Sequence, residues 1–253
     1  SKKIDKIILA TTKNIENDKL VNLVENLGYE VFRGNETDVL DRYYHAAKKH
    51  RHETVVRITG DCPIIDPELV DEIISIYGQE NADYVSNTNP PTYPDGLDTE
   101  VFSFEALKIA HEQTKDPFDR EHVTPFIKIH HQFCRKNITN KIDLSNERWT
   151  VDHPEDFLVI ENIIKHFTPS LDFSWKEVLE LKKSNPEYFI ANQKINRNEG
   201  AVMGTGQKLW NRASRVIPGG NMLLSKRPEM FLPDHWPTYF SKAKGCSVWD
   251  LDG

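Results

Sequence analysis

Short apolar runs alternate with helical patterns along the first 190 residues of the chain. Residues 4–11, 31–33 and 54–59 are rich in β-branched and other apolar residues, which predicts buried strands. Between these runs, apolar residues recur at helical spacing in 38–50 and again from Pro67 onward. Strands that alternate with helices are typical of a mostly parallel sheet covered by helices on both faces. The pattern therefore predicts an α/β fold.

The alternation continues to about residue 190. It predicts a strand at 84–86, a long loop at 87–98, helices beginning near Phe104 and His122, strands near 133–138 and at 148–152, and helices from Pro154 and over 174–189. Long loops such as 87–98 often carry function.

Composition changes after residue 190, and this change predicts the domain organisation. Residues 1–190 form the α/β domain, 191–207 are polar and indicate a linker, and 208–253 form a short C-terminal appendage. The appendage is expected to contain a helix at 208–216, a Pro-Gly-Gly break, and a strand that runs into an Asp-Gly hairpin turn. Because a strand begins close to Ser1 and the chain stops at that turn, we expect a fragment at both ends.

The charge and the cysteine content indicate which kinds of binding partner and which cellular compartment to expect. The chain has 39 acidic and 32 basic residues, and its formal net charge of −7 offers no general attraction to nucleic acid or an anionic membrane. Cys62, Cys134 and Cys246 form no Cys-x-x-Cys pair and fit neither a disulfide framework nor a zinc knuckle. No apolar run approaches the roughly 18 residues of a membrane span, and the first residues lack the apolar core of a signal peptide. We therefore expect a cytoplasmic protein.

Two aspartates share one local pattern, in which a strand is followed by Asp-x-Pro and then a helix. Asp61 follows the run 54–59, and Asp152 follows 148–151. Ligands of open α/β sheets bind beyond the carboxyl ends of the strands, so neighbouring strands would bring these carboxylates together. Converging carboxylates suit Mg²⁺ that carries substrate phosphates.

A surface role without metal is the alternative, and spacing alone leaves both open. Helix capping explains neither aspartate well. Asp66 directly precedes the helix-opening Pro67, and His153, not Asp152, directly precedes Pro154.

Five ordered segments extend this picture: residues 31–43 (VFRGNETDVLDRY), 57–67 (RITGDCPIIDP), 93–102 (YPDGLDTEVF), 120–125 (REHVTP) and 148–156 (RWTVDHPED). Together they closely resemble the spore-coat polysaccharide cytidylyltransferase family, which is akin to the enzymes that make CMP-Kdo and CMP-sialic acid. The resemblance covers about three quarters of the chain.

The resemblance implies a three-layer α/β/α sandwich of the nucleotide-diphosphosugar-transferase type that uses CTP, a sugar and Mg²⁺. A sugar hydroxyl would attack the α-phosphate of CTP, and pyrophosphate would leave. Such displacement depends mainly on positioning and charge neutralisation. Asp61 and Asp152 match the family's metal-binding, catalytic aspartates.

The resemblance also assigns substrate-binding residues. Those on the nucleotide side are Arg33 and Asp38, those in the loop that faces the sugar are Asp95, Asp98 and Glu100, and those in a second sugar-side segment are Arg120, Glu121 and His122. Two alternatives stay open. Arg33 could pair with Asp41 or Glu36 on the surface, and His122 could have a capping or structural role.

One departure from the family concerns its opening Gly-, Arg- and Lys-containing loop, which wraps the triphosphate and has no counterpart in this sequence. The resemblance therefore predicts weak CTP binding and little activity for this chain, with the intact parent as the enzyme. A homodimer is possible.

The tail carries a second resemblance. Residues 208–220 and 245–253 are similar to the opening of class III aminotransferases of the glutamate-1-semialdehyde aminomutase type. PLP would bind only in a full-length aminotransferase parent. We therefore predict a cytidylyltransferase fused to an aminotransferase. The alternatives are an aminotransferase parent with a regulatory N-terminal module, and a non-catalytic sugar-binding module.

Overall fold

The computed structural model describes residues 1–195, 197, 209, 213, 239–244, 247–249 and 251. Contacts divide the chain into two units, Ser1–Gln193 and Lys194–Gly253. In the second unit, β7 (Lys242–Lys244) and β8 (Ser247–Trp249) pair as an antiparallel hairpin. The predicted helix 208–216 and the break after it fall almost wholly outside the described residues.

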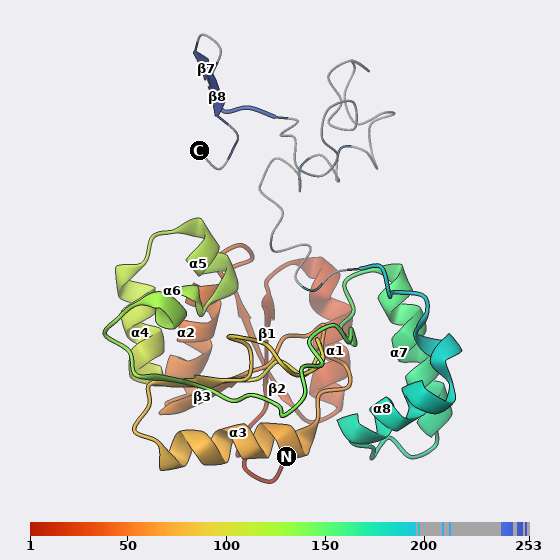
Figure 1. Ribbon diagram of the computed structural model, residues 1–253. Helices are drawn as coiled ribbons and strands as arrows, with labels where there is room; N and C mark the ends of the chain where they lie inside the picture. Colours follow the sequence, from red (N-terminus) through yellow and green to blue (C-terminus); the bar gives the residue numbers. More distant parts are fainter. Residues whose placement is uncertain are drawn as a thin grey trace. The chain divides into compact units, whose positions relative to one another are not determined.

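The strands of the first unit form two sheets (Figure 1). They are β1 (Ile8–Thr12), β2 (Glu30–Gly34), β3 (Thr54–Arg57), β4 (Tyr84–Ser86), β5 (Glu100–Ser103) and β6 (Arg135–Asn137). β1 and β2 pair in parallel, and the larger sheet has the order β3-β5-β4-β6. Within it β3, β4 and β6 share one direction and β5 runs antiparallel to both of its neighbours.

Helices and short 3-10 turns connect these strands. They are η1 (Ile15–Asn17), α1 (Asp18–Asn26), α2 (Val39–His50), α3 (Pro67–Gln79), α4 (Phe104–Gln113), α5 (Pro117–His122), α6 (Pro125–Ile129), α7 (Pro154–Phe167), α8 (Trp175–Ser184) and η2 (Pro186–Phe189). No helix in the described part of the chain is long and apolar enough to cross a bilayer.

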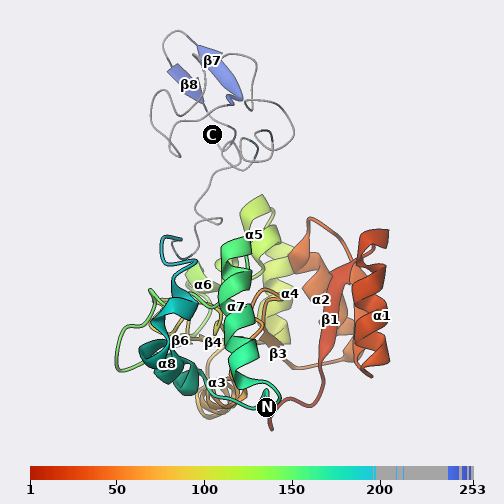
Figure 2. The ribbon, with the colours of Figure 1, turned by 90° about the vertical axis from the view of Figure 1, so that its right-hand side faces the viewer.

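Side-chain alternation along β4 and β5 creates a core on each face of the larger sheet. Val85 and Val101 are opposite each other and belong to one core, with residues of α3, α7 and α8. Tyr84 and Phe102, the next pair, belong to the other, with residues of α2, α4 and α6. Figure 1 shows α2 and α4 on the opposite side of the first unit from α7 and α8, and Figure 2 shows α2 and α4 side by side. The layers are therefore helix, sheet, helix, as expected for an α/β/α sandwich.

Several predicted elements need correction. The sequence reading missed α1, because its apolar stripe is short, and β5, because a strand buried on both faces shows no alternation. Residues 148–152 form only an isolated bridge, between Arg148 and Asp95, and not a strand. A helix ends at His122 rather than beginning there, since α5 opens at Pro117 behind the capping side chain of Asp116.

Candidate functional site

The structure brings the segments that carry Asp61 and Asp152 together. The backbone N–H of Val151, directly before Asp152, donates to the carbonyl oxygen of Asp61 at 2.9 Å. The hydroxyl of Thr150 donates to the same carbonyl at 3.0 Å. The turn after β3 is thus bonded to the segment before α7, although that segment is not a strand.

Neither aspartate caps a helix. Asp66 caps α3, because its Oδ1 accepts from the N–H groups of Glu68 at 2.8 Å and Leu69 at 2.9 Å. At α7 it is Asp156 whose Oδ2 accepts from the backbone N–H of Asp152, at 3.1 Å, and of His153, at 3.0 Å. The expected cap at Asp66 is confirmed, and the side chains of Asp61 and Asp152 serve neither helix as caps.

The buried side chain of Arg148 forms an ion pair with the exposed carboxylate of Asp152. The Arg148 side chain is only 5% exposed, whereas that of Asp152 is 47% exposed. Nη2 of Arg148 donates to Oδ2 of Asp152 at 2.8 Å. The same guanidinium forms a two-pronged pair with the buried Asp156, both bonds at 2.8 Å, and contacts Oδ2 of Asp95 at 3.2 Å.

This network shifts the pKa values of the buried groups. Burial by itself raises the pKa of Asp156, but hydrogen bonds from Arg148 and Asn192 lower it to about 2. Burial by itself lowers the pKa of Arg148, and its bonds to Asp156 and Asp152 raise it above the usual range. Both groups are therefore held in their charged forms. Asn192, which the sequence assigned to the linker, is buried in the first unit and also donates to the carbonyl of Arg148 at 3.0 Å.

The loop before β5 packs against the same segment. Gly96 has φ of +100°, and a Cβ there would lie 2.6 Å from the carbonyl of Trp149, so the close approach of the two backbones requires glycine. The N–H of Asp95 donates to Glu147 at 2.8 Å, and the N–H of Trp149 donates to Asp95 at 2.7 Å. Asp95 is buried and committed to Arg148, so its side chain supports the loop.

Asp98 lies with Asp61 around the thiol of Cys62. Burial is the main cause that raises the pKa of Cys62 to about 12, and the charges of Asp61 and Asp98 add to it. The Cys62 thiol is 3.6 Å from Oδ1 of Asp61. Arg148 therefore joins the side chains of Asp95 and Asp152. Asp61 and Asp98 lie near Cys62, and the backbone bond from Val151 to Asp61 links the two sets.

A second group joins Asp38 to Arg120. Asp38 caps α2 through the N–H of Asp41 at 2.9 Å. Its carboxylate also accepts from Nε of Arg120 at 2.9 and 3.0 Å and from Nη2 at 2.6 Å. The sequence assigned these two residues to different substrates, but the fold makes them partners of each other.

Arg33 holds the loop after β1. Its guanidinium donates to the carbonyl oxygens of Thr12 at 3.0 Å and Asn14 at 2.7 Å, and pairs with Asp18 at 2.7 Å. The alternative prediction, that Arg33 pairs with Asp41 or Glu36, is wrong. Arg33 pairs with Asp18 instead, which lies on α1, a helix that the sequence reading did not predict.

Glu100 does not belong to the sugar-side loop. It lies on β5, its side chain is 3% exposed, and it pairs with Arg57 and with Lys128, the latter at 2.7 Å. The hydroxyls of Tyr84 and Thr124 donate to Oε1 at 2.6 and 2.7 Å. Burial alone raises the pKa of Glu100, but the charges of Arg57 and Lys128 lower it to about 2. These contacts commit the carboxylate of Glu100 to partners within the fold.

The remaining two predicted residues lie at the end of α5. Glu121 is exposed, and the ring of His122 lies 4.4 Å from that of Phe118. The next residue, Val123, has φ of +74° and ψ of −54°, with a bond of 2.9 Å from the N–H of Thr124 to the carbonyl of His122. This is a strained γ-turn, and it directs Thr124 toward Glu100.

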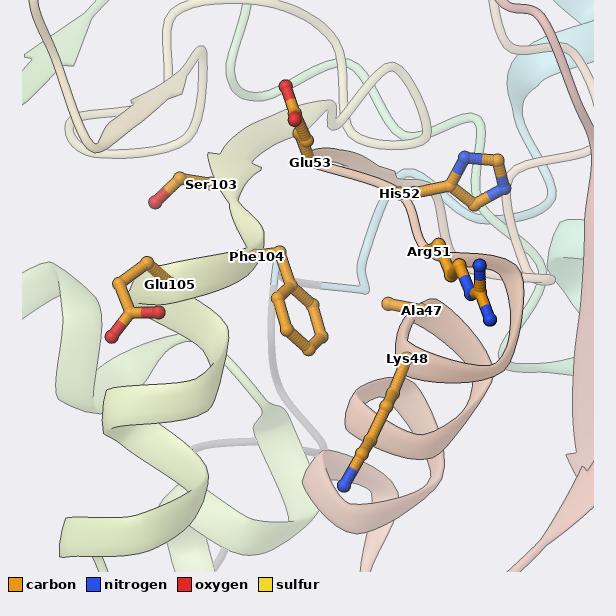
Figure 3. A pocket seen from close by; sticks show the side chains of 8 residues that line it. All are labelled: Ala47, Lys48, Arg51, His52, Glu53, Ser103, Phe104 and Glu105. Carbon is orange, nitrogen blue, oxygen red and sulfur yellow. The ribbon is translucent and has the colours of Figure 1, made fainter.

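A cavity of about 430 Å³ opens elsewhere, between the end of α2 and the start of α4 (Figure 3). Lys48 and Arg51 line it on one side, and Phe104 and Glu105 on the other. Glu53, also in its wall, precedes β3, whereas Asp61 follows that strand. The cavity therefore lies at the opposite end of β3 from Asp61 and does not contribute to that group.

The donor set around Asp61 and Asp152 suits a hard cation. It offers carboxylate oxygens on two segments that a backbone bond holds together, and Mg²⁺ takes one or two such carboxylates and completes its octahedron with waters and phosphates. The sequence reading gave no separate role to Arg148, Asp156 or Arg57. A charged residue inside an otherwise apolar run, as Arg57 is in 54–58, was the available signal for a buried ion pair.

Comparisons with known proteins show which family and fold the chain resembles. A family model described as cytidylyltransferase matches residues 1–195. An uncharacterized protein of Methanocaldococcus jannaschii is 36% identical over 200 residues, 78% of this chain and 81% of that protein. The spore coat polysaccharide biosynthesis protein SpsF of Bacillus subtilis is 30% identical over 187 residues, 72% of this chain and 77% of that protein. A cytidylyltransferase structure from Leptospira borgpetersenii matches with a TM-score of 0.71 at 30% identity, over 75% of this chain and 80% of that one, which confirms the predicted fold type.

Proposed function

The chain belongs to the cytidylyltransferase family, and from this premise we propose that it transfers CMP from CTP to a sugar for polysaccharide or glycan biosynthesis. The bond between Val151 and Asp61 supports the proposal, because it joins the backbone segments that carry two aspartates from distant parts of the sequence. The relative from Bacillus subtilis, by its name, acts in spore coat polysaccharide biosynthesis, which supports a sugar as acceptor.

Asp61 and Asp152 would hold Mg²⁺, which when bound neutralises charge on the reacting phosphates. Arg148 prepares Asp152 for this role, because its bond to Oδ2 fixes the carboxylate in one orientation. The contacts to Asp156 and Asp95 fix the guanidinium in turn. Little reorganisation is then needed when the substrate arrives, and this is the main source of electrostatic catalysis.

In the proposed reaction a sugar hydroxyl oxygen forms a bond to the α-phosphorus of CTP and gives its proton to solvent water. The bond between the α-phosphorus and the bridging oxygen breaks, and pyrophosphate leaves with the electron pair. Asp98 and His122, which are half-buried, and the exposed Glu121 are sugar-side candidates whose side chains are not buried. Asp38 and Arg120 would act as a pair on the nucleotide side.

The test is pyrophosphate release from CTP and Mg²⁺ in the presence of a panel of acidic and amino sugars, at high CTP and protein concentrations because weak CTP binding and little activity are expected of this chain. Asp61→Asn and Asp152→Asn keep the side-chain size and remove the charge, so we expect each to abolish metal-dependent release. Glu155→Gln is the matched control, because Glu155 is an exposed acid close to Asp152. Release at wild-type rates in both aspartate variants would refute the assignment.

A non-catalytic sugar-binding module is the competing function. It predicts sugar binding that is unchanged by CTP and Mg²⁺, which the same reagents test. The family match ends at residue 195, so the aminotransferase-like start at 208–253 stays a prediction, as do the homodimer and the aminotransferase parent with a regulatory module.

A further inference from the structure

A second cluster of metal-ligating side chains lies between α2 and α4. Asp41 and His45 are one helical turn apart on α2, and His111 projects from α4. Nε2 of His111 is 2.9 Å from Oδ1 of Asp41, and Nε2 of His45 is 3.3 Å from the same oxygen. One ligand atom from each residue lies within 4.8 Å of the other two. None of the three belongs to the group around Asp61 and Asp152.

We infer that Asp41, His45 and His111 bind one zinc ion or a similar borderline cation. Zinc bonds of about 2.0–2.2 Å place tetrahedral ligand atoms roughly 3.4 Å apart, close to the spacing of Asp41 and His45. Two imidazoles and a carboxylate favour Zn²⁺ over Mg²⁺, which prefers oxygen alone. The pair on α2 has the i, i+4 spacing that directs two ligands to one helix face.

Neighbouring residues fix two of the three ligands. The ring of Tyr44 stacks on His111 with centroids 4.2 Å apart and planes 14° from parallel. Nη1 of Arg120 donates to the carbonyl of His111 at 2.8 Å, and Asp38 accepts from the N–H of Asp41. The Asp38–Arg120 pair therefore anchors both helices beside the cluster, as outer-shell contacts do in metal sites.

The cluster is also open to solvent on one side. The side chains of Asp41, His45 and His111 are 29%, 49% and 21% exposed. Water can thus supply the fourth ligand, and the half-exposed His45 is able to move toward the ion. At the other end of the same helix pair lies the cavity of Figure 3, where Phe104 stacks on Tyr44 at 5.7 Å. A bound ion would clamp α2 to α4 at the end away from that cavity.

The test is titration of the full chain with Co²⁺ as a spectroscopic substitute for zinc, followed by displacement with Zn²⁺. Excess Mg²⁺ is present throughout, so that Asp61 and Asp152 do not compete for the probe. We expect one equivalent to bind with the visible absorption of four-coordinate cobalt. His45→Ala and Asp41→Asn should each weaken binding at least about tenfold, and His45 is exposed enough for the fold to tolerate the change.

Two controls make the result specific. His166→Ala removes an exposed histidine on α7, and Cys134→Ser removes an exposed thiol, so neither should change the affinity. Zinc should also raise the melting temperature of the wild type but not of His45→Ala. The proposal fails if the wild type binds no equivalent at 100 µM Zn²⁺, or if the two cluster variants bind as tightly as the controls. In that case His45 and His111 would only form hydrogen bonds to the carboxylate of Asp41.

Discussion

Replacing Arg148 by lysine should strongly destabilise the first unit. Lysine keeps the positive charge, but its single ammonium cannot reach three carboxylates in the geometry of the guanidinium. Arg148 makes two bonds to Asp156, one to Asp152 and one to Asp95. A hydrogen bond to a charged group contributes about 1.5–3 kcal/mol. Loss of two of the four bonds should therefore lower the free energy of unfolding by about 3 kcal/mol or more.

The assay is urea denaturation at neutral pH, followed by tryptophan fluorescence. Lys165→Gln provides the control, because Lys165 lies on α7 and its pair with Glu161 is 67% and 41% exposed. Loss of such a surface pair should change stability by less than about 1 kcal/mol. An Arg148→Lys midpoint within error of the wild type would refute the account of the network.

The stability difference between the wild type and Arg148→Lys should depend on pH. The pKa of Asp156 is lowered from 3.8 to about 2 in the folded state. A lowered pKa means that the stabilisation is complete above pH 3.8 and is lost as the pH falls toward about 2, an effect of about 2 kcal/mol. The difference between wild type and Arg148→Lys should shrink over that interval. A difference that stays constant down to pH 2 would assign the effect to packing instead.

Two further predictions follow from the loop before β5 and from the cysteines. Gly96→Ala should lower the free energy of unfolding by roughly 1–3 kcal/mol, because its positive φ and the carbonyl of Trp149 exclude a Cβ. Gly78→Ala, where a Cβ meets nothing within 4 Å inside a helix, should stabilise by about 0.5–1 kcal/mol. Equal changes in the free energy of unfolding for Gly96→Ala and Gly78→Ala, measured by denaturation, would contradict this prediction. At pH 8 a thiol reagent should label the exposed Cys134 before the buried Cys62, whose pKa is about 12, and mass spectrometry of the peptides would show the reverse order if this is wrong.

Periodicity predicted the main elements well because burial on one face imposes it. The strand at 84–86 and the helices opening at Pro67 and Pro154 appear as expected. β5 was missed because a strand buried on both faces, with a charged residue at its start, shows no alternation. Residues 148–152 had strand composition, but tertiary bonds to Asp61 and Asp95 satisfy their backbone instead of a ladder.

The sequence likewise predicted one part of the candidate site and missed another. The Asp-x-Pro pattern singled out Asp61 and Asp152, and the fold brings their segments together. The pairing of Asp38 with Arg120 links residues 82 positions apart, and local spacing carries no signal for it. Glu100 was misplaced because its partners lie on other elements.

The central claim is that Asp61 and Asp152 hold the metal through which CTP is bound. Calorimetric titration with CTP, with and without Mg²⁺ and beside UTP, tests it most directly in the wild type and in Asp152→Asn. The account predicts binding that needs Mg²⁺, prefers CTP and is lost in Asp152→Asn. CTP binding of equal strength without Mg²⁺, or unchanged in the variant, would contradict it.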